Sequence, residues 1–472
     1  MRRSVIATAV VSALGAIPSS PTFADTTLVF YGHADLSIDS ADNGLKMADP
    51  ATHGFPGGTN ASSTIDPTST GRVGWQSQIS SNLSRLGVRG SSDLGGGLKT
   101  VFQIETSVDI SAEPGGKDGL AGRNSFIGLA SSSWGAVKIG KTDLPYKLST
   151  GRMDPFSATI GDYNSIMGNT GGDNRAEFDT RQPHVVWYES PNWGGMRVNV
   201  AFSPGQNRNP GNVGAPQGEA NCPGGHLAPP ATSNPGGGVP GVNPNLTGSA
   251  DTPLCVDGAF HNVFSAAFLY SGGPLYAIAA YELHTQVNRI GDEASSGPVS
   301  YAAANPSAAP GSIVGIGDER AWKVGVQYKI ASSTINAIYE NMHRDAPVSA
   351  FNERQRSGTW LALTQKISAT DDVNVGWAHA GKTPGDPLIV NGAGIDNTSN
   401  MYALGYKHHF SDKHTTWYAV AATQRNHKDA HFDLGASGHG ATIDCHDNTL
   451  PSQTCYPGNI IKAISVGFTY DF

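Results

Sequence analysis

The chain alternates apolar and polar residues at every second position, in blocks of about ten residues. In the last block, one face carries Ile464, Val466, Phe468, Tyr470 and Phe472. The residues between them are Ser465, Gly467, Thr469 and Asp471. Period-two alternation predicts a β-strand with one apolar and one polar face. Such a strand fits the half-buried sheet of a soluble sandwich as well as a barrel with lipid outside and water inside, so one block leaves the fold open.

The number of blocks is more informative than any one of them. Sixteen strands are expected, at 28–38, 82–92, 98–109, 123–131, 136–142, 182–190, 196–203, 259–271, 275–285, 320–330, 334–343, 358–367, 373–380, 398–410, 415–426 and 462–472. A bacterial single-chain barrel needs an even number of strands because both chain ends lie on the periplasmic side.

The links between the blocks alternate in length. Those after even-numbered blocks are tight turns, at 93–97, 132–135, 191–195, 272–274, 332–333, 368–372 and 411–414. Those after odd-numbered blocks are mostly long, at 39–81, 110–122, 143–181, 204–258, 286–319, 344–357, 381–397 and 427–461. Short periplasmic turns and long external loops are typical of an outer-membrane barrel, whereas a sandwich has no reason to separate loop lengths in this way. The sequence therefore predicts an all-β fold, a 16-stranded antiparallel transmembrane β-barrel.

The amino end predicts export. Arg2 and Arg3 precede an apolar stretch from Val5 to Ile17, and small residues lead to Ala24, which is the pattern of a cleavable signal peptide at 1–24. Cleavage there leaves 472 − 24 = 448 residues, 25–472, for the barrel. No later apolar run reaches 18 residues, so no spanning helix is expected in the mature chain.

Composition agrees with a wet interior. The hydrophobic fraction is 38% and 59 residues are glycine, a poor supply for a thick apolar core. A barrel tolerates this because its inward positions can be polar. The net charge of −8 becomes −10 once the two signal-peptide arginines are removed, which argues against a nucleic-acid partner.

The four cysteines form two local pairs, Cys222 with Cys255 and Cys445 with Cys455. An even count in an exported chain predicts two disulfide bonds, each closing one loop. A zinc site is the alternative, because His446 follows Cys445, but the spacing of ten matches no close metal-binding pattern. Neither a metal nor another cofactor is expected.

Several motifs occur in a fixed order along the chain: LVFYGHADLSI at 28–38, SRLGVRGSSDLGGGLKTVFQIETSVD at 84–109, GRNSFIGLASSSWGAVKIGKTDLPY at 122–146, DPF at 154–156, and the ending ISVGFTYDF. In these motifs the chain resembles the Gram-negative general porins, particularly the trimeric sixteen-stranded group common in β-proteobacteria. The resemblance implies a homotrimer in which each barrel is its own pore. It also implies that the third external loop, about 143–181, folds into the barrel, and that Phe472 is a signal for the outer-membrane assembly machinery. The two cysteine pairs and the long loop at 204–258 depart from that group.

A channel selects by its width and by the fixed charges on its walls. Alternation with apolar neighbours directs three basic side chains inward, Arg85, Arg89 and Lys138. The same basic wall is extended by Lys99, Arg123 and Lys141. The third loop offers acids opposite this wall: Asp143, Asp154, Asp162, Asp173, Glu177 and Asp179. The hypothesis is a transverse field between a basic wall and an acidic loop at the constriction.

A purely structural role is the alternative for these charges. Arg89 can pair with Asp93 near the periplasmic turn, and the loop acids can bind backbone groups that hold the fold. The sign of the selectivity also stays open at this point. The basic wall favours anions, whereas the net charge of the chain favours cations.

The sequence thus predicts an outer-membrane porin, not an enzyme, for passive diffusion of small hydrophilic solutes and ions. A substrate-selective channel of the same fold is the nearest alternative. A secreted all-β binding protein would keep the signal peptide and the alternation but not the two classes of loop length. An outer-membrane hydrolase is the remaining alternative. No local motif marks a Ser, His and acid set, but catalytic partners need not be neighbours in sequence.

Overall fold

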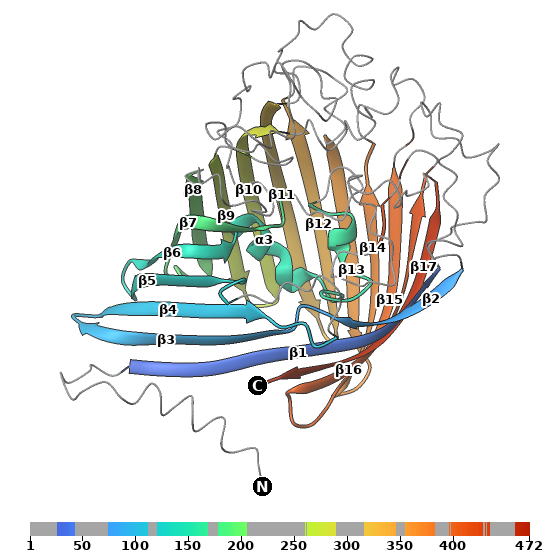
Figure 1. Cartoon of the computed structure of the whole chain (residues 1–472), viewed down its shortest axis with the longest axis horizontal. Helices are drawn as coiled ribbons and strands as arrows, with labels where there is room; N and C mark the ends of the chain where they lie inside the picture. Colours follow the sequence, from blue (N-terminus) through green and yellow to red (C-terminus); the bar gives the residue numbers. More distant parts are fainter. Residues whose placement is uncertain are drawn as a thin grey trace, which may run out of the picture.

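One antiparallel sheet that closes on itself forms almost all of the structure (Figure 1). This computed structural model describes residues 26–42, 74–111, 120–168, 178–204, 260, 262–288, 316–345, 355–382, 396, 398–427, 430, 432–434 and 458–472. The first strands are β1 (Thr26–Asp42), β2 (Trp75–Ser81), β3 (Arg85–Gly95), β4 (Leu98–Ser107), β5 (Ser125–Ser131), β6 (Gly135–Asp143), β7 (Arg181–Glu189) and β8 (Met196–Pro204). They are followed by β9 (Asn262–Gly272), β10 (Leu275–Asn288), β11 (Ile316–Ile330), β12 (Ser333–Arg344), β13 (Arg356–Lys366), β14 (Asp371–Ala380), β15 (Ser399–His409), β16 (Thr415–Asn426) and β17 (Ile460–Asp471).

Strand β1 closes the barrel. Its residues 33–42 pair with the last strand, β17. On its other side, residues 36–42 pair with β2 and residues 26–33 with β3. Strands β2 and β3 are therefore two parts of one interrupted strand, and the described sheet is a closed barrel of sixteen antiparallel strands, as the sequence predicts.

The interruption at residues 82–84 is held by buried polar groups. Leu83 has a positive φ of 55°, which turns the chain away from the extended path. The Asn82 side chain donates to Asp35 Oδ1 at 3.2 Å and to the Tyr418 hydroxyl at 3.0 Å. The irregularity is thus tied to β1 and to β16, at the place where the barrel closes.

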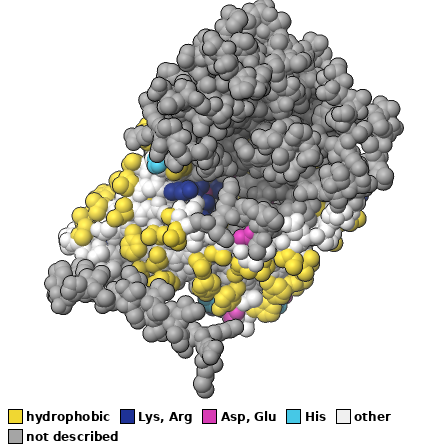
Figure 2. Space-filling view, in the orientation of Figure 1, with side chains coloured by type: hydrophobic (Ala, Val, Ile, Leu, Met, Phe, Trp, Pro, Cys, Tyr) yellow, Lys and Arg dark blue, Asp and Glu magenta, His cyan; other side chains and the backbone are white. Residues whose placement is uncertain are grey.

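The apolar residues of the strands lie on the outside. On β11 the side chains of Trp322, Val324 and Val326 are 43%, 45% and 47% exposed, whereas Lys323 between them is 1% exposed. The last strand repeats this pattern, with Phe468 exposed and Ser465 buried. Figure 2 shows hydrophobic side chains spread over the described part of the visible face. This is the reverse of a soluble sandwich and fits a barrel whose outer face contacts lipid.

The predicted strands are confirmed, with shifted ends. The largest difference is β2, which lies within the predicted external link 39–81. Its residues Trp75 and Ile79 face outward and are 52% and 57% exposed. Ser77 stands between them on the same face, so the apolar alternation is too weak to identify the strand from sequence.

The described residues between β6 and β7 lie inside the barrel (Figure 1). We call residues 144–180 the inserted loop; 144–168 and 178–180 are described. It contains the helix α3 (Pro145–Thr150) and two short 3-10 helices, η1 (Gly151–Met153) and η2 (Tyr163–Ser165). Helix α3 packs against strands β8, β9 and β10. None of the described helices is long and apolar enough to cross a membrane.

Candidate functional site

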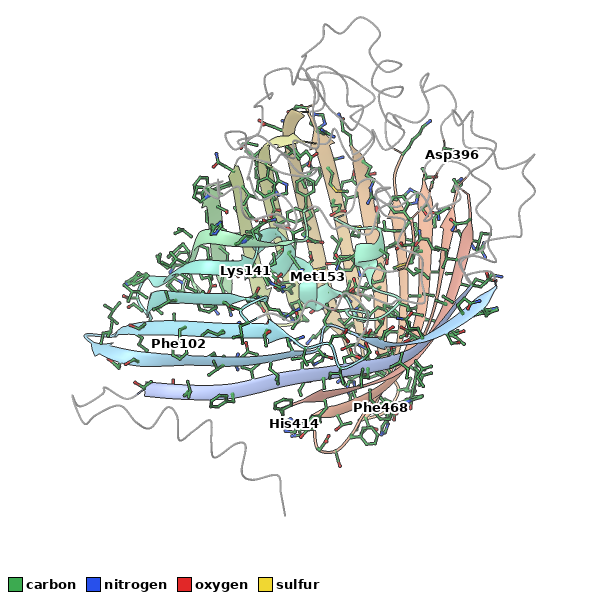
Figure 3. All side chains as sticks on the ribbon, in the orientation of Figure 1. Phe102, Lys141, Met153, Asp396, His414 and Phe468 are labelled. Carbon is green, nitrogen blue, oxygen red and sulfur yellow. The ribbon has the colours of Figure 1, made fainter. Side chains whose placement is uncertain are left out.

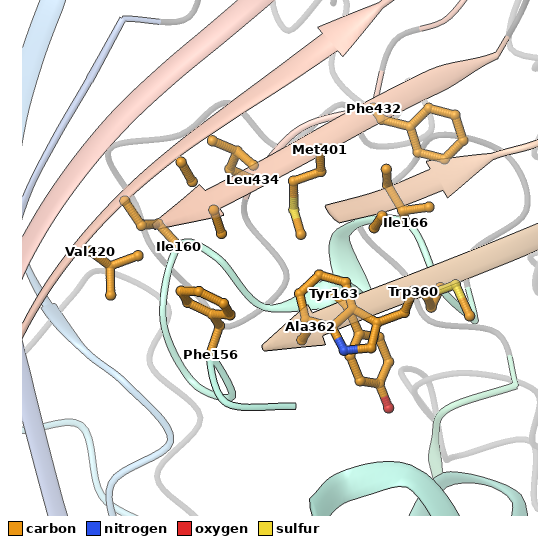
Figure 4. Close-up of a cluster of buried hydrophobic side chains, with 14 of the residues drawn as sticks. Phe156, Ile160, Tyr163, Ile166, Trp360, Ala362, Met401, Val420, Phe432 and Leu434 are labelled. Carbon is orange, nitrogen blue, oxygen red and sulfur yellow. The ribbon is translucent and has the colours of Figure 1, made fainter. Parts of the chain in front are cut away.

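The inserted loop packs against one side of the barrel through apolar side chains (Figure 4). Phe156, from the sequence DPF, lies edge-on to Trp360 of β13, with the ring centroids 6.2 Å apart. Tyr163 lies 5.6 Å from the same indole ring. The cluster also includes Ile160 of the loop and Met401 of β15, and all five side chains are at most 3% exposed. The loop therefore rests on the wall formed by β10 to β17.

Glycines on the inner face of that wall make room for the loop. A Cβ atom on Gly376 or on Gly405 would lie 2.9 Å from the Phe156 ring, and one on Gly325 would lie 3.0 Å from the Met153 side chain. Distances this short leave no space for a larger residue. Figure 3 shows Met153 near the middle of the barrel, away from the wall strands that carry Phe102 and Phe468.

A buried ion pair fixes the loop to β11. The Lys323 Nζ atom lies 2.7 Å from Asp179 Oδ1, and both side chains are 1% exposed. The same ammonium group donates to Thr150 Oγ1 at 2.8 Å and lies 4.0 Å above the Tyr146 ring. One side chain of the wall thus contacts the start and the end of the inserted loop.

Strands β12 and β13 contribute further anchors. Glu340 accepts hydrogen bonds from the Tyr146 hydroxyl at 3.1 Å and from the Gly168 backbone N–H at 2.7 Å. Arg356 donates to the Ile166 carbonyl, and the Trp360 indole N–H donates to the Met153 carbonyl at 3.2 Å. The loop is consequently held along most of its described length.

The acids of the loop do not face the lumen where they are described. Asp154 accepts from the Phe156 N–H at 2.9 Å, and Asp162 accepts from the Ala158 and Asn164 N–H groups at 3.1 and 2.9 Å. Asp154, Asp162 and Asp179 are 9%, 3% and 3% exposed. The prediction that these three acids line the lumen is wrong, because they bind the backbone of the loop or the wall behind it. Asp173 and Glu177 lie outside the described residues.

Burial also disfavours the charged form of Asp154. The pKa of the Asp154 carboxyl is raised well above its ordinary value, mainly because the carboxyl is removed from water and also because Asp162 is close. The charged form of Asp154 is therefore disfavoured at this buried position.

The exposed side of the loop is basic instead. Lys147 has a side chain that is 36% exposed, and Arg152 is also exposed. Leu148 and Gly151 are the exposed residues between them. The loop therefore presents positive charge where negative charge was expected.

A group of charged side chains lies at the base of the loop, on β3, β4, β6 and β7, just before β5 and on helix α3. We call Arg85, Glu105, Arg123, Asp143, Lys147 and Arg181 the β3–β7 cluster. The Arg123 Nε atom lies 2.7 Å and the Arg85 Nε atom 3.9 Å from Glu105. Asp143 lies 3.0 Å from Arg181 and 3.2 Å from Lys147. Four basic groups surround two acidic ones, so this cluster carries 4 − 2 = +2.

Asp143 differs from its predicted place. It ends strand β6 and is not part of the irregular loop, and it is 8% exposed between its two basic partners. The prediction that Asp143 offers negative charge across the lumen is wrong for this reason.

The model of the Gram-negative porin family matches residues 7–429. This chain belongs to that family. An outer membrane porin protein of Bordetella pertussis is 32% identical over 181 residues, which cover 38% of this chain and 43% of the relative. The major outer membrane protein P.IA of Neisseria meningitidis is 28% identical over 194 residues, 41% of this chain and 45% of the relative. The matched stretch thus spans less than half the length of these curated relatives. The anion-selective porin from Comamonas acidovorans has the same fold, with a TM-score of 0.60, 17% identity, and coverage of 95% of this chain and 100% of that chain.

Family membership places the apolar outer face of this porin in the outer membrane. The other residues predicted for the basic wall take different positions. Arg89 is exposed, with its guanidinium carbon 5.0 Å from the centre of the Tyr31 ring. Lys138 forms an ion pair with Glu189 at 2.8 Å, so its charge is compensated. Lys99 pairs in register with Asp93, close to the β3–β4 turn.

Lys141 is the last residue predicted for the basic wall. It pairs in register with Ser125 of β5, two positions after the pair formed by Ile139 and Ile127. Ile139 and Ile127 face lipid, with 52% and 54% exposure, but the register of β6 with β7 shifts between Gly140 and Thr142, so this alternation does not continue to Lys141. That Lys141 joins the inner basic wall therefore stays a prediction; its place on β6 is labelled in Figure 3.

Sequence reasoning did not identify several basic residues in the described part of the porin lumen, among them Lys147, Arg152, Arg181 and Arg197. Arg197 could have been found, because it alternates with the apolar Val198 and Val200 on β8. Lys147 and Arg152 lie on an irregular segment, where alternation gives no direction. The four cysteines and the predicted signal peptide lie outside the described residues.

Proposed function

We propose that this porin is a channel for passive diffusion of small hydrophilic solutes and ions, and that it prefers anions. The observation that carries the proposal is the orientation of the inserted loop, whose described acids are buried while Arg152 is exposed and Lys147 is half-buried. The basic β3–β7 cluster lies at the base of the same loop. Positive side chains along the passage raise the local concentration of anions.

Local charges decide this preference more than the net charge does. The chain carries −8 overall, which alone favours cations. Salt screens charges beyond about 8–10 Å at physiological ionic strength, so distant acids act weakly on an ion inside the lumen. The name of the Comamonas acidovorans structure, an anion-selective porin, agrees with this proposal. The family also favours a channel over an enzyme.

The first test is the reversal potential of purified protein in a planar bilayer with a salt gradient. Stepwise conductance with a reversal potential on the anion side is expected. Replacing Arg85 by glutamine should lower the anion-to-cation permeability ratio by about threefold, the scale of one screened charge a few ångströms away in water. Lys138→Gln is the matched comparison and should act less, because Glu189 already compensates that charge. A folded protein that never conducts, or a preference for cations, would contradict the proposal.

The proposal includes a homotrimer with one pore per chain, inserted by the outer-membrane assembly machinery through the terminal Phe472. The contacts of this residue with β1 support a role in closure. Gly32 and Phe472 exchange two backbone hydrogen bonds of 2.9 and 3.1 Å. A Cβ atom on Gly32 would lie 2.2 Å from the Phe472 ring, so the ring lies directly over this glycine.

Replacing Gly32 by valine is expected to block this contact and to impair barrel closure. The folded barrel and the unfolded chain migrate differently in unheated detergent gels, and the variant should lose most of its folded band. Ser40→Val on the same strand is the control, because it places the same valine side chain away from the terminal ring. Normal folding of Gly32→Val would show that closure does not depend on this contact.

A further inference from the structure

Arg152, on the exposed side of the inserted loop, is fixed against the barrel wall. Its Nη2 atom donates to Gln327 Oε1 at 2.9 Å, and its guanidinium carbon lies 4.2 Å from the centre of the Tyr276 ring. The Gln327 amide in turn donates to the Arg152 carbonyl at 3.1 Å. These contacts fix the direction of a side chain that is otherwise flexible.

The contacts of Arg152 leave its charge uncompensated. In the described part of the chain, its guanidinium contacts an amide and an aromatic ring, neither of which is an acid. This differs from the β3–β7 cluster, where Glu105 and Asp143 bind the basic groups. A fixed guanidinium with a free edge is well suited to bind a carboxylate or a phosphate through two parallel hydrogen bonds.

A second exposed arginine lies on β8, two strands before β10 in the sheet. Arg197 of β8 shares a strand face with Ala201, which is 1% exposed, whereas Met196 and Phe202 of the other face contact lipid. It pairs in register with Leu269 of β9, and Leu269 packs against the apolar cluster beneath the loop. Arg197 is therefore an inward residue on a strand close to those that hold Arg152.

Arg152 and Arg197 lie at a different position along the pore from the β3–β7 cluster. Tyr276 and Gln327 are paired in register, one residue from the start of β10 and three from the end of β11. The turn joining β9 to β10 is short, as are the periplasmic turns of such barrels. Arg197 is likewise the second residue of β8, after a short turn. Both arginines thus lie toward the periplasmic end of the lumen.

We propose that Arg152 and Arg197 form a second anion-binding step at the periplasmic side of the inserted loop, with a preference for solutes that carry carboxylate or phosphate groups. An anion that has passed the β3–β7 cluster meets this pair before it leaves the pore. The inference rests on the proposed anion-conducting channel and adds to it a solute class and two specificity-determining residues.

The test uses the full-length protein in planar bilayers, with inorganic phosphate as the probe. Phosphate added to a chloride solution should reduce the chloride current of the wild type, because it occupies the site. Arg152→Gln and Arg197→Gln should each weaken this block and lower the anion-to-cation permeability ratio by about threefold, as expected for one screened charge. Arg152→Lys should keep the ion preference but weaken the phosphate block, because an ammonium group lacks the two parallel donors.

Two controls separate charge from structure. Arg320→Gln removes a positive charge from the outer face of β11 and should leave both readouts unchanged. The largest neutral polyethylene glycol that enters the pore measures its width, which Arg152→Gln should not change. A changed width with unchanged phosphate block would assign Arg152 to loop support alone and overturn the inference.

The two proposals fail in different ways. If the wild type prefers cations, the proposed function is wrong. If the wild type prefers anions but the Arg152 and Arg197 variants match it in phosphate block and permeability ratio, only the second step is wrong.

Discussion

Replacing Lys323 by methionine is expected to release the inserted loop from the wall and to raise the single-channel conductance. The change leaves Asp179 buried, with a side chain that is 1% exposed, and without its counter-charge. Removing one partner of a buried ion pair costs about 3–5 kcal/mol. Thr150 and Tyr146 lose their contact with the ammonium group at the same time. The loop would then leave the lumen wider, and larger neutral polymers should enter the pore.

The double variant Lys323→Met, Asp179→Leu is the decisive control. Replacing both charges by apolar residues of similar size is often neutral, because the desolvation cost of the pair disappears with its attraction. Its conductance should therefore return toward the wild-type value. Lys329→Met removes an exposed lysine from the same strand and should have no effect on the polymer cut-off. Wild-type conductance in Lys323→Met would show that this ion pair does not hold the loop.

The strands could be predicted because a barrel imposes one simple rule on each of them. Every second residue must face lipid. Trp322, Val324 and Val326 therefore identify β11 without any knowledge of the neighbouring strands. The rule fails where the outer face is polar, as at Ser77 of β2. It also shows only that a residue such as Lys323 points inward. Whether such a residue meets water or a buried partner depends on what fills the lumen.

The inserted loop could not be interpreted in this way. Asp154 and Asp162 are acids in a segment that enters the barrel, and sequence alone suggests that they face the basic wall. Their side chains instead accept hydrogen bonds from backbone groups two to four residues away, which is a common role of Asp in turns. Arg152 was missed for the same reason, since its direction is set by Tyr276 and Gln327, which are distant in the chain.

The inner-wall glycines are a further signal that composition hides. The composition alone connects abundant glycine with a small apolar core. In the structure, Gly376 and Gly405 occupy positions where the Phe156 ring approaches the wall. They determine where the loop lies as much as the ion pair does. A side chain added at such a position provides an independent way to move the loop.

Replacing Gly405 by valine is expected to push the middle of the loop toward the β3–β7 cluster and to lower the conductance. A Cβ atom at this position would lie 2.9 Å from Phe156 Cε1, closer than the 3.5 Å to Val420 on the wall. Overpacking of this kind costs about 1–3 kcal/mol. The Lys323–Asp179 pair and the Glu340 hydrogen bonds still hold the ends of the loop, so the loop moves inward and does not leave the barrel.

Phe156→Ala tests whether the valine at position 405 acts through the Phe156 ring. In the Gly405→Val background it removes the ring that the valine meets, so conductance should recover toward the wild-type value. Leu404→Val is the matched control on β15, because Leu404 is 56% exposed on the lipid face and does not contact the loop. Conductance and polymer cut-off are measured for the wild type, Gly405→Val, the double variant and Leu404→Val. Together they separate loop displacement from general damage to the barrel. If the double variant conducts as poorly as Gly405→Val alone, the valine does not act through Phe156, and Gly405 does not determine where the Phe156 ring packs.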